Sequence, residues 1–223
     1  MEQLLGEGSI GAIDSVRACF SVLDPEEPSA DDPLRDWRQQ TERGGGVPYD
    51  LACYCVDACN HFVDALPERA VAVGARSERY GTINRLYGLI EYGDPPVGIV
   101  TSSMRSDFDH ELRVSGTTGQ VVLPVAWRIE GPIVVTVSRS IGWGRFREER
   151  FEIAAADPYR LQLEQFAAVI RGETEPAPTL AESVVAALSL DALVRSAADG
   201  TSVDFDVPAD VSAKREARRA GRG

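Results

Sequence analysis

One stretch of the sequence carries acidic, phenolic and imidazole side chains at helical spacing. It follows Gly44-Gly45-Gly46 and begins near Pro48, a residue type favoured in the first turn of a helix. At about 100° per residue, its polar members share a stripe roughly 80° wide: Asp50, Tyr54, Asp57, His61 and Asp64. Carboxylates, a phenol and an imidazole on one face are groups that can exchange protons with a bound ligand.

The same predicted helix is apolar around most of its circumference. Leu51, Cys55, Ala58, Phe62 and Leu66 are among its apolar members. A helix of this kind is largely buried, so a polar stripe on it faces water, a partner or a ligand. The stripe is therefore either a solvated outer face or a site with four candidate catalytic residues: Tyr54, Asp50, Asp57 and His61.

The predicted elements around this helix run in the order strand, helix, many strands, two helices, strand. Residues 12–23 predict a first strand, and Asp157 with Pro158 predicts the start of a helix that ends near Gly172. A Thr-x-x-Glu capping box predicts another helix from Thr179 to Gly200, with a last strand at 202–207. Seven segments between the helices read as short strands, at 70–77, 84–92, 97–104, 109–115, 119–123, 132–138 and 147–154.

This order predicts an α+β fold for residues 1–208. We expect a mostly antiparallel open sheet with helices packed on one face and the other face free for oligomerisation. His110 alternates with Leu112 and Val114 along one predicted strand face, which favours a structural role for it in the inner layer.

Charge and composition exclude several classes of protein. The formal charge of −12 and the pI near 4.7 argue against nucleic-acid binding. There is neither an apolar run long enough to span a membrane nor a signal-peptide pattern, so we expect a cytoplasmic protein without membrane contact. Residues 209–223 are basic and short of large apolar side chains, which predicts a disordered tail.

The cysteine spacing predicts no metal site. Only Cys55 and Cys59 could face a common ion, and no second pair lies within zinc-site spacing, so the four cysteines are expected to be reduced thiols. Lys214 is the only lysine, and it lies in the predicted tail. The folded body therefore has no lysine for Schiff-base or proton-donor chemistry.

Landmarks along residues 1 to about 207 resemble the C-terminal domain of the Gfo/Idh/MocA oxidoreductases. The first are Asp36-Trp37-Arg38, the three glycines, and Asp50 with Tyr54. The later ones are Ser115-Gly116-Thr117-Thr118-Gly119, Asp157-Pro158-Tyr159 with Gln162 and Phe166, and Leu190-Asp191-Ala192-Leu193 with Ser196-Ala197 and Gly200.

The position of Tyr54 separates branches of that family. Most members carry histidine there, whereas the glucose-fructose oxidoreductase and dihydrodiol dehydrogenase branch carries tyrosine, as this chain does. The resemblance implies that Asp50 binds or orients substrate and that Tyr54 exchanges the proton of a hydroxyl or carbonyl. It also places Trp37 and Arg38 at the substrate pocket, although a packing anchor beside a solvated arginine fits them equally well.

Trp143 is a further candidate substrate-binding residue. It lies in the glycine-rich run Ile141-Gly142-Trp143-Gly144-Arg145-Phe146, which would suit stacking on a ring or sugar. Packing within the loop explains the same residues.

The resemblance also implies a nucleotide-binding Rossmann domain in front of this domain, and this sequence shows no Gly-rich strand-turn-helix motif for one. We therefore expect no cofactor to bind this chain alone, and NAD(P) only where a partner supplies the Rossmann domain.

Three functions follow from these observations. The first is the substrate-binding and oligomerising half of an oxidoreductase system that acts on a sugar, polyol or related carbonyl compound. The second is a cofactor-independent acid/base enzyme, such as a lyase, isomerase or cyclase in a biosynthetic pathway, in which Asp57 and His61 at i, i+4 supply a group that titrates near neutral pH. The third is a non-catalytic binding module.

Overall fold

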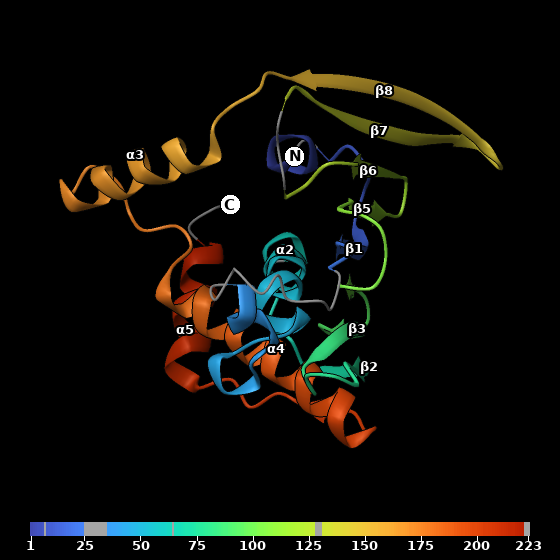
Figure 1. The fold of residues 1–223 in the computed structure, drawn as a ribbon. Coiled ribbons are helices and arrows are strands. Elements are labelled where there is room, and N and C mark those ends of the chain that lie inside the picture. Colours follow the sequence, from blue (N-terminus) through green and yellow to red (C-terminus); the bar gives the residue numbers. More distant parts are fainter. Residues whose placement is uncertain (7, 25–34, 64, 128–130, 221–223) are drawn as a thin grey trace.

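The computed structural model describes residues 1–6, 8–24, 35–63, 65–127 and 131–220, and Asp64 lies outside these ranges. Nine strands form one sheet in the order β8-β7-β6-β5-β1-β4-β3-β2-β9 (Figure 1). The strands are β1 (Ile13–Ser21), β2 (Arg69–Arg76), β3 (Ile83–Glu91), β4 (Val97–Ser103), β5 (Leu112–Gly116), β6 (Gly119–Leu123), β7 (Ile133–Gly142), β8 (Arg145–Ile153) and β9 (Val203–Asp204). The helices are α1 (Glu2–Gly6), α2 (Cys53–Val63), α3 (Pro158–Ile170), α4 (Leu180–Asp199) and α5 (Ala209–Ala220).

The predicted α+β class and the mostly antiparallel sheet are confirmed. Of the strand pairs formed by the described residues, only β1 and β4 run parallel, with Val16 beside Gly98 and Ala18 beside Val100. This pairing follows from the chain path, because α2, β2 and β3 all intervene before β4 returns to the side of β1. Strand β1 thus lies at the centre of the sheet, directly under α2.

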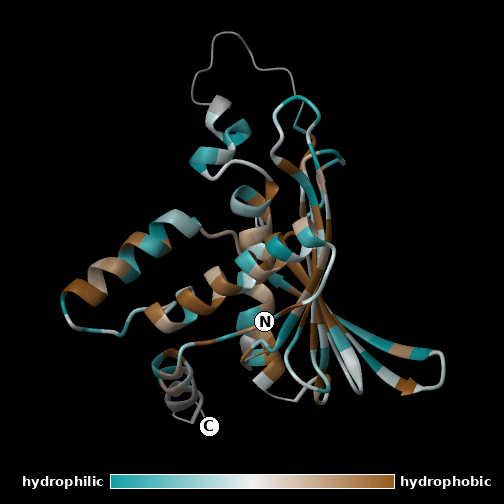
Figure 2. Cartoon of the chain, turned by 90° about the horizontal axis from the view of Figure 1, so that it is seen from below, coloured by the Kyte–Doolittle hydropathy of each residue, from teal (hydrophilic) through white to brown (hydrophobic). Residues whose placement is uncertain are grey.

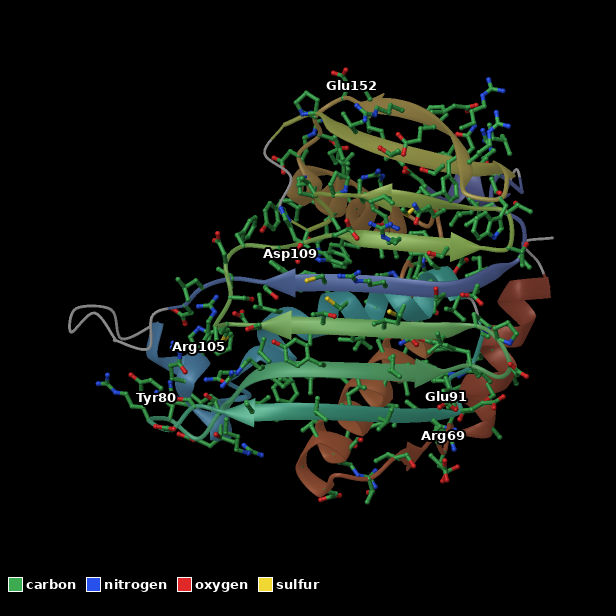
Figure 3. The ribbon with its side chains drawn as sticks, turned by 90° about the vertical axis from the view of Figure 1, so that its right-hand side faces the viewer. Arg69, Tyr80, Glu91, Arg105, Asp109 and Glu152 are labelled. Carbon is green, nitrogen blue, oxygen red and sulfur yellow. The ribbon has the colours of Figure 1, made fainter. Side chains whose placement is uncertain are left out.

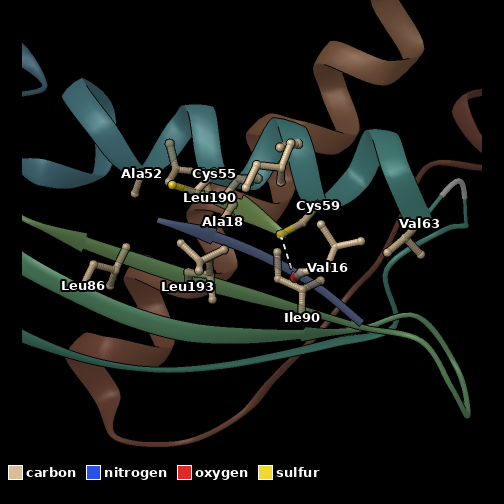
Figure 4. Close-up of a cluster of buried hydrophobic side chains, with 14 of the residues drawn as sticks. Val16, Ala18, Ala52, Cys55, Cys59, Val63, Leu86, Ile90, Leu190 and Leu193 are labelled. Carbon is tan, nitrogen blue, oxygen red and sulfur yellow. Dashed lines mark hydrogen bonds between the residues drawn. The ribbon is translucent and has the colours of Figure 1, made fainter. Parts of the chain in front are cut away.

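The core lies between the sheet and two helices, α2 and α4. Helix α2 contributes Cys55, Cys59 and Val63 from its buried face, and Ala52 lies directly before the helix. These residues meet Val16 and Ala18 of β1 and Leu86 and Ile90 of β3 (Figure 4). The Cys59 thiol donates a hydrogen bond to the carbonyl oxygen of Val16 at 3.6 Å. Cys55 and Cys59 of α2 therefore act as small apolar core residues with a weak donor.

Helix α4 begins and ends at the residues that the sequence indicated. The Thr179 side chain accepts from the Glu182 backbone N–H, the Glu182 carboxylate accepts from the Thr179 backbone N–H, and Gly200 closes the helix with φ 70°. Leu190 and Leu193 of α4 pack into the same core (Figure 4). Both ends of α4 are thus fixed by local signals, and its middle by burial.

Two helices differ from the prediction: α3 does not pack on the sheet, and α5 forms where no helix was expected. Helix α3 has no buried residue and stands away from the sheet, as Figures 1 and 2 show. A helix, α5, spans Ala209–Ala220, where we expected disorder, and residues 221–223 of that tail lie outside the described ranges. Alanine, lysine and arginine favour helix, Lys214 lies 3.6 Å from Asp210 one turn earlier, and Val211 packs against Ala181 and Val185.

The second face of the sheet carries no helix of the described residues, and Figure 3 views it directly. Tyr80, Arg105 and Asp109 lie at one end of the sheet on this view, and Arg69 with Glu91 at the other. Among the described residues, no helix combines the length and hydropathy needed to cross a membrane.

Candidate active site

A short loop brings the segment with Trp37 and Arg38 against the start of the central helix. These two residues lie on the 3-10 helix η1 (Arg35–Gln39), which is followed by η2 (Thr41–Arg43). The backbone N–H of Gly46 donates to the Arg38 carbonyl at 2.7 Å. A Cβ on Gly45 would lie 2.6 Å from that carbonyl oxygen, so only glycine allows the close approach.

The central helix opens at Pro48 as expected, although its first turn is wider than predicted. Residues Pro48–Ala52 form a π-helical turn, η3, before α2 continues. Gly46, with φ 101°, precedes it, and a Cβ there would meet the Ile83 carbonyl oxygen at 2.7 Å. The turn therefore sits directly on the end of β3, and the helix presents Asp50 toward η1.

Asp50 is held in place by Arg38. The Arg38 Nε donates to Asp50 Oδ1 at 3.0 Å, and both side chains are partly buried. The Arg38 guanidinium also lies 4.6 Å above the ring of Trp37. The structure thus brings together Trp37, Arg38 and Asp50, three residues that the sequence singled out.

Tyr54 lies one helical turn after Asp50, with about half of its side chain exposed (49%). Its ring centroid is 5.5 Å from that of Phe20 and 6.1 Å from that of Trp127. Burial is the main cause that raises the pKa of Tyr54 above 10, and negative charge on Cys53, Tyr159 and Asp50 acts in the same direction. The phenol is therefore protonated at neutral pH and suited to donate a proton.

Asp57 and His61 continue the polar stripe along the solvent side of α2, and both are exposed. Desolvation raises the pKa of Asp57 above its usual range, the His61 charge opposes this shift, and the Glu182 charge adds to it. The His61 ring packs edge-on against Phe62 at 4.9 Å. Asp57 and His61 therefore interact electrostatically, and they lie about one and two helical turns beyond Tyr54.

Trp143 lies apart from these residues. It is fully exposed in the turn between β7 and β8. The hairpin formed by these two strands extends outward from the rest of the sheet in Figure 1. In this chain the hairpin does not bring its indole to the group around Tyr54.

The structure adds aromatic residues that the sequence analysis did not select. Phe20, from the end of β1, is surrounded by Tyr54, Phe108, His110 and Trp127. The rings of Phe108 and His110 are 4.2 Å apart, and the Trp127 indole Nε1–H donates to the Cys19 carbonyl at 2.9 Å. We call Phe20, Phe108, His110 and Trp127 the aromatic wall of the site.

His110 is buried with Leu112 and Val114, as its alternation predicted. Phe20 lies within the strand predicted at 12–23. For Phe108 and Trp127 the only sequence signal was the aromatic residue type, because both come from irregular segments.

Among the residues that the structure describes, the thiols and carboxylates near the site form no metal centre. Within the described residues, no group of three or more His, Cys, Asp or Glu side chains could hold an ion. Cys19 donates to Asp109 Oδ2 at 3.2 Å, and burial followed by this hydrogen bond raises the pKa of Cys19 to about 11. At neutral pH Cys19 is therefore a protonated thiol and a poor nucleophile.

Comparison with known proteins agrees with this architecture. Residues 2–205 match the family model described as "Oxidoreductase family, C-terminal alpha/beta domain" of the Gfo/Idh/MocA proteins. The chain is 31% identical over 198 residues to a D-xylose 1-dehydrogenase (NADP(+)) 2 of Haloferax volcanii, covering 88% of this chain and 58% of that protein. It is 31% identical over 128 residues to a trans-1,2-dihydrobenzene-1,2-diol dehydrogenase of Mus musculus, covering 57% of this chain and 36% of that protein.

Among solved structures, a 3-ketoreductase from Actinomadura kijaniata has the same fold. Its crystal structure, determined with NADP and TDP-benzene, matches with a TM-score of 0.75 at 22% identity, over 87% of this chain and 57% of that chain. The chain thus spans at most about three fifths of each of these three proteins. From its match to the family model over residues 2–205, the chain belongs to the Gfo/Idh/MocA oxidoreductase family, whose C-terminal alpha/beta domain it contains.

Proposed function

We propose that this chain is the substrate-binding and oligomerising half of an oxidoreductase system that acts on a sugar, polyol or related carbonyl compound. The observation that carries the proposal is the fixed carboxylate of Asp50, held by Arg38 one helical turn before the half-exposed phenol of Tyr54. A carboxylate accepts hydrogen bonds from sugar hydroxyls, and a protonated phenol can donate to a carbonyl oxygen.

The surroundings of Tyr54 favour a ring-shaped polyol over a small acid. Trp127 and Phe108 give the site an apolar wall, which suits the C–H face of a sugar ring, while Asp50 and Arg38 supply the polar edge. The D-xylose dehydrogenase among the relatives gives the substrate class to test first.

The nucleotide would come from elsewhere. Hydride transfer requires a nicotinamide held against the substrate carbon, usually by a strand-turn-helix phosphate site at the edge of a parallel sheet. In the described ranges, α2 is followed by an antiparallel strand pair and no glycine-rich turn opens α4. NAD(P) would therefore bind only when a Rossmann domain is supplied by other residues or by a separate protein.

A titration of the purified chain tests both parts of this proposal. We expect D-xylose to give measurable heat of binding and Asp50→Asn to weaken that binding by at least about tenfold, because a charged hydrogen-bond acceptor is lost. NADPH added to the same protein should leave nicotinamide fluorescence unchanged. Micromolar NADPH binding by residues 1–223 would refute the missing nucleotide site, and equal sugar affinity in Asp50→Asn would refute the role of Asp50.

The oligomerising part of the proposal rests on the helix-free face of the sheet. Val71, Val73, Tyr87 and Leu89 are neighbouring large apolar residues on β2 and β3 that remain exposed there. Apolar surface of this kind on one sheet face favours a second copy as its cover. We expect a dimer or larger oligomer by light scattering, and Val73→Asp should shift it toward the monomer, whereas Leu180→Asp, on an exposed helix end, should not.

A second function is favoured by the interaction between Asp57 and His61. With this pair, the chain would be a cofactor-independent acid/base enzyme in which His61 acts as the base and Tyr54 as the acid. Turnover of a substrate without any nucleotide, abolished by His61→Ala, would support this function over the first.

A further inference from the structure

Strand β8 forms one edge of the sheet and is exposed along its whole length. Among the described strands it pairs only with β7, and none of its nine residues is buried. Figure 3 shows this margin of the sheet, where Glu152 lies. The outer N–H and C=O groups of an edge strand can bond a further strand, and proteins commonly keep such edges short or covered. Within the described residues, β8 is neither.

The hydrogen bonds of β7 show which backbone groups of β8 face outward. The Ser140 N–H donates to the Thr118 carbonyl at 2.9 Å, so the even-numbered residues of β7 bond toward β6. Because antiparallel bonding alternates along a strand, the odd-numbered residues of β7 bond to the residues opposite them on β8, as Val137 does to Glu149. The outward backbone groups therefore belong to the even-numbered residues of β8, which are Phe146, Glu148, Arg150 and Glu152.

The charges of β8 are balanced, although the chain is strongly acidic. The strand carries three arginines and three glutamates, whereas the whole chain has a formal net charge of −12. Two copies therefore repel each other less along this strand than over most of their surface. Charges of a single sign would keep two such edges apart, but mixed charges allow them to pair in a register that places opposite charges together.

The two faces of β8 differ in how their charges are used within the chain. On one face, Glu149 pairs with Arg139 at 2.9 Å and with Arg147 at 3.4 Å. Glu148 and Arg150 lie on the opposite face, beside hydroxyl side chains of β7. None of the described residues forms an ion pair with either of them. A charged partner for Glu148 and Arg150 would therefore come from outside the described chain.

We infer that β8 pairs with β8 of a second copy, antiparallel and across a two-fold axis at Glu149. In this register Glu148 of each copy lies opposite Arg150 of the other, and Phe146 lies opposite Glu152. All four outward-facing residues thus gain a backbone partner, and two pairs of opposite charge form. Glu149 meets its own copy at the axis, where each carboxylate already has two arginine partners. The two sheets become one continuous sheet.

This contact goes beyond the proposed function and is separate from the one proposed on the helix-free face. The face contact involves β2 and β3, which lie at the other end of the strand order. One copy can therefore take part in both contacts. A single strand pair gives a small contact, so the edge dimer is expected to dissociate in the micromolar to submillimolar range.

Charge reversal tests the pairing and its register. Glu148→Arg places arginine opposite arginine twice, and Arg150→Glu places glutamate opposite glutamate twice. Each variant should weaken self-association by at least about tenfold. Mixed together, the two variants should associate with each other about as tightly as the unaltered chain does with itself, because both facing pairs again have opposite charge. Sedimentation equilibrium in the Val73→Asp background, which removes the face contact, measures these affinities.

Glu152→Arg is the matched control for charge reversal. It makes the same change of charge on the same strand but faces Phe146, so it should alter self-association by less than about threefold. Unchanged self-association in Glu148→Arg, no recovery on mixing, or a Val73→Asp chain that stays monomeric at submillimolar concentration would each overturn the inference.

A disulfide at the axis tests the same register without the Val73 substitution. Two Glu149→Cys copies would face each other as a pair without backbone hydrogen bonds, about 4.5 Å apart at Cα, which is within reach of a disulfide. Two Glu152→Cys copies would lie about 20 Å apart along the strands. We expect mild oxidation to link Glu149→Cys at least about tenfold faster than Glu152→Cys. Equal rates, or no product from Glu149→Cys, would contradict the pairing.

The proposed function fails through different measurements. D-xylose binding depends on Asp50 and should be the same in Glu148→Arg as in the unaltered chain. Loss of edge pairing with sugar binding intact would thus leave the proposed function standing. Absence of sugar binding, or no effect of Val73→Asp on the face contact, would contradict the proposed function and leave the pairing of β8 standing.

Discussion

Tyr54→Phe is expected to lower kcat for NADP-dependent sugar oxidation by about a hundredfold to ten-thousandfold, the usual contribution of a positioned acid or base. The phenyl ring keeps the contacts of Tyr54 with Phe20 and Trp127, so the loss reports the hydroxyl group itself. The measurement uses a chimera in which residues 2–205 replace the matching region of the Haloferax volcanii D-xylose dehydrogenase. The value of KM should change by less than about threefold, because Asp50 and Arg38 are untouched.

The matched control is Tyr87→Phe, which removes a hydroxyl of similar exposure from the helix-free face of the sheet. An equal loss of kcat in both variants would contradict the role of Tyr54. His61→Ala should retain NADP-dependent activity in the chimera, whereas its inactivation would favour the alternative acid/base function.

The raised pKa of Tyr54 also predicts the direction of the pH dependence. Burial raises the pKa of Tyr54 above that of a free phenol, so the side chain stays protonated through neutral pH. Reduction of a carbonyl, in which Tyr54 donates a proton, should be independent of pH through neutrality and decline only above that pKa. Oxidation of an alcohol, in which the phenolate accepts a proton, should instead rise steadily with pH. A fall in oxidation rate between neutral and alkaline pH would contradict this assignment.

The elements that sequence reasoning located well are those specified by adjacent residues. Thr179 with Glu182 and Gly200 fix the two ends of α4, and Asp157 with Pro158 opens α3 as predicted. Strand β5 begins at Leu112 instead of 109, and the predicted strand at 202–207 shrinks to Val203–Asp204. Residues 205–207 run past the start of β2 at Arg69, whereas β1 continues to Ser21 and keeps an isolated bridge to Asp109. β propensity alone cannot show where pairing stops.

Long-range arrangement was harder to predict. The parallel pairing of β1 with β4 depends on where the chain returns after α2, β2 and β3, and no local pattern encodes that path. Helix α3 has an amphipathic pattern like that of a packed helix, yet none of its residues is buried in the described part of the chain. The pattern predicts that a helix face will be buried, but it does not specify the surface that buries it.

The part of the candidate site that lies on the central helix could be predicted from the sequence. Asp50 and Tyr54 follow from i, i+4 spacing, and the nearby Arg38 was found by resemblance. Phe108 and Trp127 join them only after β1 and β5 pair, because they lie more than fifty residues away in the chain. Trp143 had the same residue type and a glycine-rich context, but its hairpin extends outward.

Leu193→Ala is expected to lower the free energy of unfolding by about 3 kcal/mol, within the range for a buried leucine that leaves a cavity. Leu193 is fully buried between α4 and the sheet (Figure 4). Leu180→Ala, on the same helix but 79% exposed, should cost less than about 0.5 kcal/mol. Urea denaturation followed by circular dichroism measures the free energy of unfolding of both variants. Similar losses of stability in the two would contradict the placement of Leu193 in the core.

The opposing residue, Gly88 of β3, shows why this loss is large and how it can be partly reversed. A Cβ at Gly88 would lie 2.5 Å from Leu193 Cδ2 and 3.2 Å from the Ala72 Cβ, so the leucine fills the space that glycine leaves open. Gly88→Ala should therefore destabilise the unaltered protein by about 1–3 kcal/mol through overpacking. In the Leu193→Ala background the added methyl enters the vacated space, and the same substitution should be neutral or stabilising. A coupling energy of more than about 1 kcal/mol between the two sites would establish the contact, since additive effects are expected only for residues that do not touch.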